Sequence, residues 1–253
     1  MRDARLLAAD AAGVAPDRMT VIAPDPAPAD ALAGLEARVA ARAAGASVAH
    51  VIGRKSFWGR EFHVDPHVLA PRPETEALVA AALEADWGRA IDLGTGSGCI
   101  AVALLAERPG ARGVGTDLSD GALRVAGRNA AAHGVADRLE LVRADWWDEV
   151  RGRFDLVASN PPYLAEREMA GLAPEVLAEP RRALTPGGDG LGAHRAIAAG
   201  LGAHLAPGGT VFLEIGPTQG AAVAGLLSAA GLTDVAVLPD MDGRDRVVRG
   251  RAP

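Results

Sequence analysis

The sequence predicts an α/β protein in which a small helical domain precedes a doubly wound sheet of seven strands. Its 253 residues are enough for a larger domain and a smaller one. Stretches rich in alanine, leucine and arginine run from Arg2 to about Gly53, whereas short β-branched runs alternate with helical stretches from Arg89 onward. Hydrophobic residues form 49% of the chain and charged residues 23%, which is ordinary for a protein that buries a full core.

The N-terminal part is expected to contain two helices, at residues 3–12 and 29–44. Between them lies Pro24-Asp25-Pro26-Ala27-Pro28. Proline lacks a backbone N–H and clashes with the preceding helical turn, so this segment predicts a loop. We expect residues 1–54 to form a separate helical domain.

A linker is predicted next, over residues 55–76. Aromatic and β-branched residues surround a glycine in the segment 57–64, which favours a short hairpin. The following Pro71-Arg72-Pro73-Glu74-Thr75-Glu76 is expected to be extended until Glu74 or Thr75 begins a helix. Residues 77–253 then form the α/β domain.

Seven strands are predicted in this domain. They are residues 90–93, 113–117, 139–143, 155–159, 210–215, 234–238 and 246–249. Alternation with helices indicates a parallel sheet that helices cover on both faces. In such open sheets, ligands bind beyond the carboxyl ends of the strands, so the site is expected there.

The composition favours some classes of binding partner, and one cellular compartment, over others. The net charge of −6 provides no basic field for nucleic-acid backbone. Cys99 is the single cysteine, which excludes an intramolecular disulfide and favours a reducing cytoplasm, and we expect it to be a buried packing residue. The N-terminus lacks a signal-peptide core, and no window of 18 apolar residues predicts a membrane span. The six histidines are scattered without a ligand cluster, so no metal site is expected.

A glycine-rich loop follows the first predicted strand of the sheet. It reads Asp92-Leu93-Gly94-Thr95-Gly96-Ser97-Gly98. Glycines there allow a sharp turn and a close approach of backbone to ligand. Dinucleotide sites space their glycines as G-x-G-x-x-G, whereas this loop reads G-x-G-x-G. The spacing favours S-adenosylmethionine, which has no pyrophosphate to hold.

Two further strand ends carry candidate cofactor contacts. Asp117 ends the second strand, where a carboxylate can accept from both hydroxyls of a ribose. Asp145 and Trp146 follow the third strand, where a carboxylate can accept from the adenine amino group while a ring packs on the purine. Trp147 competes with Trp146 for the aromatic role, and a helix cap or a core tryptophan remains the structural alternative.

The most specific motif is Asn160-Pro161-Pro162-Tyr163, directly after a predicted strand. Two successive prolines remove two backbone donors, which leaves carbonyl oxygens free to accept hydrogen bonds. Asn160 adds a side-chain carbonyl, and Tyr163 adds a ring that can lie against a flat group. Together they can hold a planar –NH₂ group and orient its nitrogen toward a methyl donor, and orientation supplies much of the rate of such transfers.

With these motifs the chain resembles the bacterial peptide chain release factor glutamine N5-methyltransferases, from its first helices to its carboxyl end. Further markers are Phe57-Trp58-Gly59, the 71–76 segment, Glu179-Pro180, Gly188-Asp189-Gly190-Leu191 and Glu214-Ile215-Gly216. The resemblance implies a Rossmann-like class I S-adenosylmethionine-dependent methyltransferase domain that acts on the glutamine of the Gly-Gly-Gln motif in class 1 release factors. Members carry additional helical residues before the position of Met1, which implies a slightly shortened recognition domain here.

The resemblance also implies roles for single residues. The donor would contact Gly94, Thr95, Gly96, Ser97, Gly98, Asp117, Asp145, Trp146 and Asn160. The catalytic residues would be Asn160, Pro161 and Tyr163, and Pro162 would join them in binding the substrate. Residues 72–75 resemble a family segment that closes over the cofactor.

Three alternatives remain open at this point. The N-P-P-Y motif also occurs in methyltransferases that act on the adenine amino group of DNA or RNA, although these need a phosphate-binding surface. The related ribosomal-protein glutamine methyltransferases are a second alternative, but their counterpart of residues 71–76 does not read P-R-P-E-T-E. A nonenzymatic nucleotide-binding module is the third, and it would leave the N-P-P-Y loop without a role.

Overall fold

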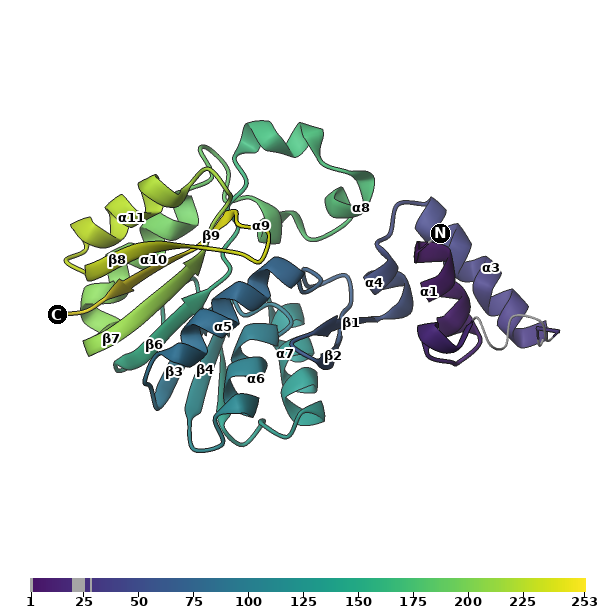
Figure 1. Cartoon of the computed structure of the whole chain (residues 1–253), viewed down its shortest axis with the longest axis horizontal. Coiled ribbons are helices and arrows are strands. Elements are labelled where there is room, and N and C mark those ends of the chain that lie inside the picture. Colours follow the sequence, from purple (N-terminus) through teal and green to yellow (C-terminus); the bar gives the residue numbers. More distant parts are fainter. Residues whose placement is uncertain (1, 20–25, 28) are drawn as a thin grey trace.

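The N-terminal helices form a separate lobe beside the α/β part of the molecule, as the computed structural model shows (Figure 1). The structure describes residues 2–19, 26–27 and 29–253. Helices α1 (Arg2–Ala11) and α3 (Ala29–Ala43) confirm both predictions within one residue at each end. Of the predicted proline loop, Pro26 and Ala27 are in neither helix nor strand, and Pro24, Asp25 and Pro28 lie outside the described residues.

Another α-helix of this lobe, α4 (Val48–Ile52), was not predicted. Ser47 caps its start by accepting a hydrogen bond from the backbone N–H of His50, and Gly53 ends it in the left-handed conformation at φ 73°. Both are ordinary helix signals, but five residues are too few to show a periodic pattern.

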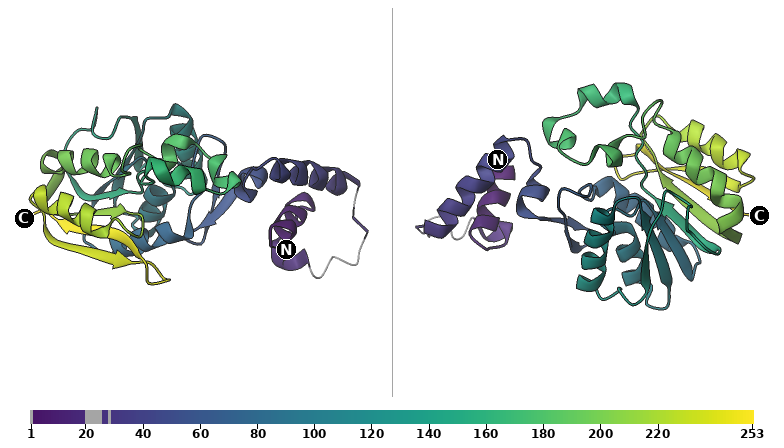
Figure 2. Two further views of the ribbon diagram at one scale, coloured as in Figure 1. Left: turned by 90° about the horizontal axis from the view of Figure 1, so that it is seen from above. Right: turned by 180° about the vertical axis from the view of Figure 1, so that it is seen from behind.

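The predicted hairpin connects the lobe to the rest of the chain (Figure 2). Strands β1 (Arg54–Phe57) and β2 (Arg60–His63) pair in antiparallel fashion, and the turn residues Trp58 and Gly59 both have positive φ, at 50° and 66°. Such turns match the twist of the strands. The predicted segment is confirmed, although the first strand begins earlier, at Arg54.

All seven predicted strands are present in one sheet, with the order β5-β4-β3-β6-β7-β9-β8. Their bounds are β3 (Arg89–Leu93), β4 (Arg112–Asp117), β5 (Leu139–Arg143), β6 (Phe154–Ser159), β7 (Leu205–Glu214), β8 (Thr233–Pro239) and β9 (Asp245–Arg251). The largest difference is at β7, which begins at Leu205 rather than at Thr210.

The predicted parallel sheet contains one antiparallel strand. β9 runs antiparallel to both of its neighbours, β7 and β8. A tight turn at Asp240 joins β8 to β9, with the Asp240 carboxylate accepting from the N–H groups of Asp242 and Arg244. Because parallel strands need a long crossover, so short a connection allows only antiparallel pairing.

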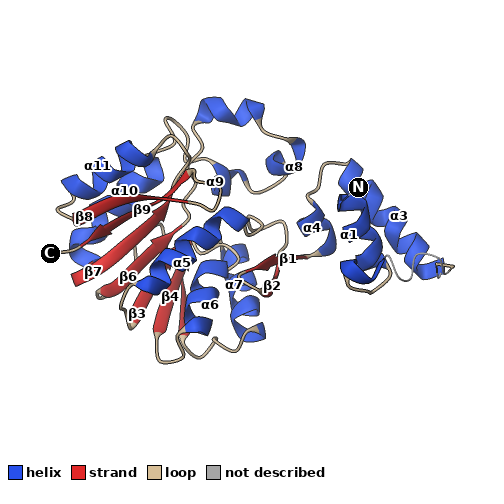
Figure 3. Ribbon diagram, viewed as in Figure 1, coloured by secondary structure: helices blue, strands red, loops and turns tan. Residues whose placement is uncertain are grey.

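Helices cover the sheet on both faces (Figure 3). Helices α5 (Glu76–Glu84), α6 (Cys99–Glu107) and α7 (Asp120–Ala132) pack with one another, and α10 (Gly192–His204) packs with α11 (Gly220–Ala229). Each set lies over its own cluster of buried apolar side chains, and Cys99 is buried in the first cluster. None of the helices in the described ranges has the length and hydropathy of a membrane span.

An excursion separates β6 from α10 and passes over the carboxyl edge of the sheet (Figure 1). It contains η3 (Glu166–Gly171), α8 (Pro174–Leu177) and α9 (Arg181–Leu184). β3 pairs in parallel with β4 on one side and with β6 on the other, and β6 pairs in parallel with β7. The order in which the chain adds strands to the sheet therefore reverses between β3 and β6. Ligands of doubly wound sheets bind at this reversal, so the fold positions a site below the excursion.

Candidate active site

The glycine loop after β3 adopts a conformation that only glycine takes without strain. Gly94, Gly96 and Gly98 all have positive φ, at 70°, 54° and 79°. A Cβ on Gly98 would also lie 3.1 Å from the Cβ of Ala126 on α7. The loop therefore turns tightly under α7 and delivers the chain into α6, with its backbone exposed to the space beyond the strand.

Asp92 holds this loop from inside the protein. Its Oδ2 accepts hydrogen bonds from the Thr95 hydroxyl at 2.6 Å and from the N–H of Ala101 at 3.3 Å. Burial raises its pKa to about 6 despite these bonds. The side chain thus has a structural part in shaping the loop.

A cavity of about 440 Å³ opens at the carboxyl ends of β3, β4, β5 and β6. This volume is within the range of small-molecule sites. Of the predicted site residues, the cavity wall includes Gly94, Thr95, Gly96, Ser97, Asp117, Asp145, Trp146, Asn160 and Pro162. Gly98, Pro161 and Tyr163 are adjacent in sequence to residues of the wall but do not form part of it. Four loops that are far apart in sequence therefore meet at one site.

Asp117 stands where β4 ends, beside the glycine loop. Its Oδ2 accepts from the N–H of Gly96 at 3.0 Å and its Oδ1 from the N–H of Ser119 at 2.9 Å. Burial raises the pKa of this carboxyl group, and the backbone hydrogen bonds and Arg182 act against the rise. Each carboxylate oxygen can accept more than one hydrogen bond, so a diol could still bind here.

The two adjacent tryptophans have different surroundings. Trp146 has a positive φ of 52° and lies against Gly94, so its ring forms part of the cavity wall. Trp147 points into the protein, where its indole N–H donates to the carbonyl of Ile197 at 2.9 Å and its ring stacks on His204 at 4.7 Å. Trp146 is therefore the tryptophan available to a cofactor.

The N-P-P-Y loop lies on the other side of the cavity and is held by side chains from several elements. The Ser159 hydroxyl donates to the carbonyl of Leu93 at 2.6 Å, which joins the two loops at their base. Asn160 donates from Nδ2 to the hydroxyl of Thr75 at 3.0 Å. The Tyr163 hydroxyl donates to Glu214 Oε1 at 3.4 Å, so this ring packs behind the cavity.

Glu214, at the end of β7, is a buried acid behind the loop. Its side chain has no solvent exposure, and burial raises its pKa to about 7. Its Oε2 has no partner that meets hydrogen-bond geometry. The sequence motif Glu214-Ile215-Gly216 marked this residue only by family resemblance, because a single acid at a strand end gives no sign of burial.

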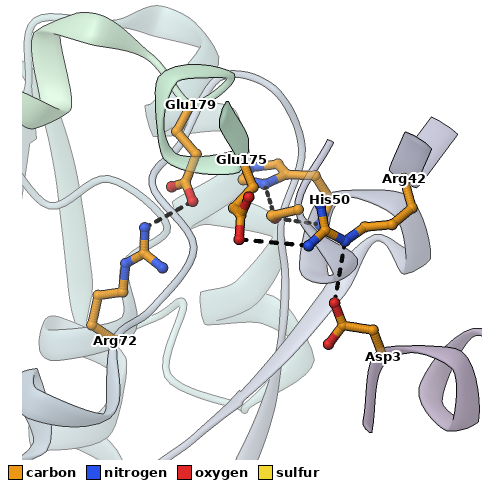
Figure 4. Close-up of polar contacts among 7 residues, drawn as sticks. Asp3, Arg42, His50, Arg72, Glu175 and Glu179 are labelled. Carbon is orange, nitrogen blue, oxygen red and sulfur yellow. Dashed lines mark hydrogen bonds and ion pairs between the residues drawn. The ribbon is translucent and has the colours of Figure 1, made fainter. Parts of the chain in front are cut away.

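An ion pair closes the rim of the cavity (Figure 4). Glu179, whose side chain is 1% exposed, accepts from Arg72 at 2.8 Å and from the backbone N–H of Ala70 at 3.0 Å. Arg72 and Ala70 line the cavity, and so does Pro180, which is next to Glu179. Sequence reasoning assigned no role to Glu179, since its partners lie more than one hundred residues away.

Comparisons with known proteins identify the family. A family model described as methyltransferase small domain matches residues 73–191. A release factor glutamine methyltransferase of Cereibacter sphaeroides is 59% identical over 253 residues, which cover 100% of this chain and 91% of that protein. The chain belongs to the release factor glutamine methyltransferase family. Its Rhodospirillum rubrum member is 44% identical over 259 residues, which cover 99% of this chain and 78% of that protein.

The fold comparison agrees with family membership. A 16S rRNA N2 G1207 methyltransferase of T. thermophilus, solved with AdoMet and guanosine, superposes with a TM-score of 0.57 at 20% identity. The match covers 79% of this chain and 50% of that chain, and at this identity it concerns the fold alone. The predicted fold class, a Rossmann-like class I methyltransferase domain, is confirmed.

Proposed function

We propose that this protein transfers the methyl group of S-adenosylmethionine to the side-chain amide nitrogen, N5, of the glutamine in the Gly-Gly-Gln motif of class 1 peptide chain release factors. Family membership supports the reaction, because the relatives carry that name. The observation that carries the mechanism is the position of Asn160, which lines the same cavity as the glycine loop.

The cavity fits the proposed cofactor. The left-handed glycines of the loop leave room for a ligand against the backbone, and Asp117 and Trp146 line the same cavity, which supports assigning the ribose to Asp117 and the adenine ring to Trp146. When bound, S-adenosylmethionine supplies an electrophilic methyl group on a sulfonium sulfur. We assign Gly94, Thr95, Gly96, Ser97, Gly98, Asp117, Asp145, Trp146 and Asn160 to its binding.

The residues of the N-P-P-Y loop would hold the acceptor. Asn160 Oδ1 and the carbonyl oxygen of Pro161 each accept one N–H of the substrate amide, which leaves the face of its nitrogen toward the methyl donor. Positive charge develops on that nitrogen during transfer, so both hydrogen bonds strengthen in the transition state. As the N–C bond forms, the S–C bond to the methyl group would break and the sulfur would leave as a neutral thioether. The nitrogen then loses one of its two protons to water, and the product is an N-methyl amide. Pro162 and Tyr163 complete the acceptor side.

The N-terminal helices would recognise the release factor as a whole protein. We assign residues 1–54 to this domain, 55–76 to the linker and 77–253 to the methyltransferase domain. Arg42 of α3 pairs with Asp3 at 3.2 Å and with Glu175 of α8 at 3.5 Å, so the helical lobe contacts the excursion that follows β6 (Figure 4). Removing the lobe is expected to weaken methylation of the protein more than donor binding.

The test offers radiolabelled S-adenosylmethionine together with one of several acceptors. These are a class 1 release factor, its Gln→Asn variant at the Gly-Gly-Gln motif, a ribosomal protein, and single-stranded and duplex DNA. We expect label in the parent release factor alone. Label in DNA, or equal label in the parent and the Gln→Asn variant, would overturn the proposal.

A further inference from the structure

The arginines that line the cavity, Arg72 and Arg182, differ in their partners. Arg72 donates to the buried Glu179 at 2.8 Å, so a carboxylate already offsets its charge (Figure 4). Arg182 belongs to α9, and its side chain makes no hydrogen bond or ion pair with any residue that the structure describes. Arg182 therefore brings to the cavity wall a positive charge that no carboxylate of the described chain contacts.

Arg182 and the arginine before it lie on different sides of α9. Arg181 donates to both carboxylate oxygens of Glu166, at 2.6 and 2.8 Å, and is not part of the cavity wall. Consecutive residues of a helix point about 100° apart, which separates the two side chains. Burial raises the pKa of Asp117, and the positive charge of Arg182 acts against that rise. Arg182 is therefore near the carboxyl end of β4, which the cavity also includes.

The residues on either side of Arg182 fix α9 beside the cavity. Glu179, before the helix, is buried in its ion pair. Leu184 and Thr185, at its end, are 6% and 7% exposed. The carbonyl of Leu184 accepts from the N–H of Leu164 at 3.0 Å, and the Thr185 hydroxyl donates to the carbonyl of Leu164. A side chain on a fixed backbone loses less conformational freedom when it binds a ligand, so Arg182 is well placed to bind one.

The backbone of the glycine loop is less suited to hold an anionic group. The N–H of Thr95 donates to the carbonyl of Thr116 at 2.7 Å, and the N–H of Gly98 donates to the carbonyl of Thr95 at 2.8 Å. The N–H of Gly96 donates to the Asp117 carboxylate at 3.0 Å. These N–H groups already have partners within the protein. An anionic group in the cavity is therefore better served by a side-chain cation, which forms stronger, charge-assisted hydrogen bonds.

We propose that Arg182 binds the carboxylate in the methionyl part of the donor. This inference rests on the proposed function, in which the donor is S-adenosylmethionine. The sulfonium and ammonium groups of this donor are positive, and its carboxylate is its only negative group. A cation in the cavity wall would repel the donor as a whole unless it contacts that carboxylate. The guanidinium group suits the contact, because it can donate two parallel N–H groups to one carboxylate.

The experiment measures, by calorimetry, binding of S-adenosylmethionine and of decarboxylated S-adenosylmethionine, which lacks only the carboxylate. Arg182→Gln removes the charge, and Arg181→Gln is the matched control on the same helix, since Arg181 pairs outside the cavity. We expect Arg182→Gln to raise the Kd of S-adenosylmethionine by about tenfold or more, the effect of losing hydrogen bonds between charged groups. The decarboxylated donor should bind this variant at least as tightly as it binds the wild-type protein, because a repelling cation is gone. Arg182→Lys should recover part of the loss, and Arg181→Gln should change neither Kd.

The sign of the change separates a direct contact from a general effect of charge. A cation that acts only at a distance repels both ligands, so its removal would tighten the binding of both. A Kd for S-adenosylmethionine that is unchanged or lower in Arg182→Gln, or a Kd raised equally for both ligands, would overturn the assignment. Tm should stay close to that of Arg181→Gln, because Arg182 has no side-chain partner in the described chain to lose. Normal donor binding without methyl transfer to a release factor would instead contradict the proposed function and leave the assignment of Arg182 intact.

Discussion

The two sides of the cavity are built by different means. The glycine loop after β3 owes its shape to backbone conformation, since three of its residues are glycines in the left-handed region. Asp92 holds this loop through hydrogen bonds to residues fewer than ten positions away. The N-P-P-Y loop is held by side chains of distant segments, including Thr75 and Glu214. Under the proposed function, this difference means that the cofactor side of the site is built from local contacts, whereas the acceptor side depends on contacts with distant segments of the fold.

The largest effect is expected from removing the acceptor contact alone. Asn160→Ala should lower kcat by about 100-fold or more, the magnitude seen when a positioned transition-state hydrogen bond is removed. Donor Kd should change by no more than a few-fold, because Asn160 is only one of the residues assigned to donor binding and the glycine loop and Asp117 are untouched. Single-turnover methylation of a release factor, with calorimetric titration of the donor, measures both. Equal losses in transfer and in donor binding would mean that the two sides are not separable.

The converse change tests the donor side. Asp117→Ala should weaken binding of S-adenosylmethionine by about 1.5–3 kcal/mol, the range for hydrogen bonds to a charged group. Asp120→Ala is the matched control, since its carboxyl group is 61% exposed and pairs only at the surface with Arg143. Calorimetry that finds the same affinity for both variants would remove Asp117 from the ribose site.

Alanine substitutions at two glycines test how tightly the N-P-P-Y loop is packed against the neighbouring backbone. Gly188 and Gly190 both have positive φ, at 57° and 83°. A Cβ at Gly190 would collide with the carbonyl oxygen of Tyr163 and lie 2.8 Å from the N–H of Ala165, whereas at Gly188 it would meet nothing within 4 Å.

Gly188→Ala should therefore cost only the conformational strain, about 1–2 kcal/mol. Gly190→Ala should cost about 1–3 kcal/mol more, because the loop must move to admit the methyl group. Denaturant unfolding of the two variants gives the difference directly. Equal stabilities would show that the loop accommodates the change without resistance.

The smallest effect concerns stability and pH. Burial raises the pKa of Glu214 from 4.5 to about 7, so the folded state binds the proton more tightly than the unfolded state. Unfolding free energy should then fall as pH rises from 4.5 to about 7 and stay lower above that. The other ionisable groups that act on this carboxyl group are Arg246, Glu74, Tyr163 and Cys99.

Glu214→Gln should remove this part of the pH dependence, while the similar effect of Asp92 remains in both proteins. Urea unfolding at a series of pH values compares the two slopes. A wild-type slope no steeper than that of the variant would show that Glu214 is not held against its ordinary ionisation.

The same difference between local and long-range contacts explains what could be predicted from the sequence. Strands, the hairpin and the glycine loop depend on local patterns, and all were found within a few residues of their predicted positions. β9 is antiparallel because the turn at Asp240 that precedes it is short, and the pattern of predicted strands does not indicate this consequence. The Glu179–Arg72 pair and the hydrogen bond from the N–H of Ala70 to Glu179 join residues that are more than one hundred positions apart, so no local signal indicates them.

The two tryptophans illustrate the limit at a single position. Asp145-Trp146-Trp147 offers two aromatic side chains in succession, and the sequence did not decide between them. The positive φ of Trp146, at 52°, turns one ring to the cavity and leaves the other to pack beneath α10. The backbone conformation at Trp146, which depends on tertiary packing, therefore decides which of the two rings lines the cavity.

The most direct measurement is tandem mass spectrometry of a class 1 release factor after incubation with the purified protein and S-adenosylmethionine. We predict a single added methyl group on the side-chain nitrogen of the Gly-Gly-Gln glutamine, and no added methyl group when Asn160→Ala replaces the wild-type enzyme for the same short time. A methyl group on a different residue type, or an unmodified release factor under conditions in which the donor binds, would contradict the account.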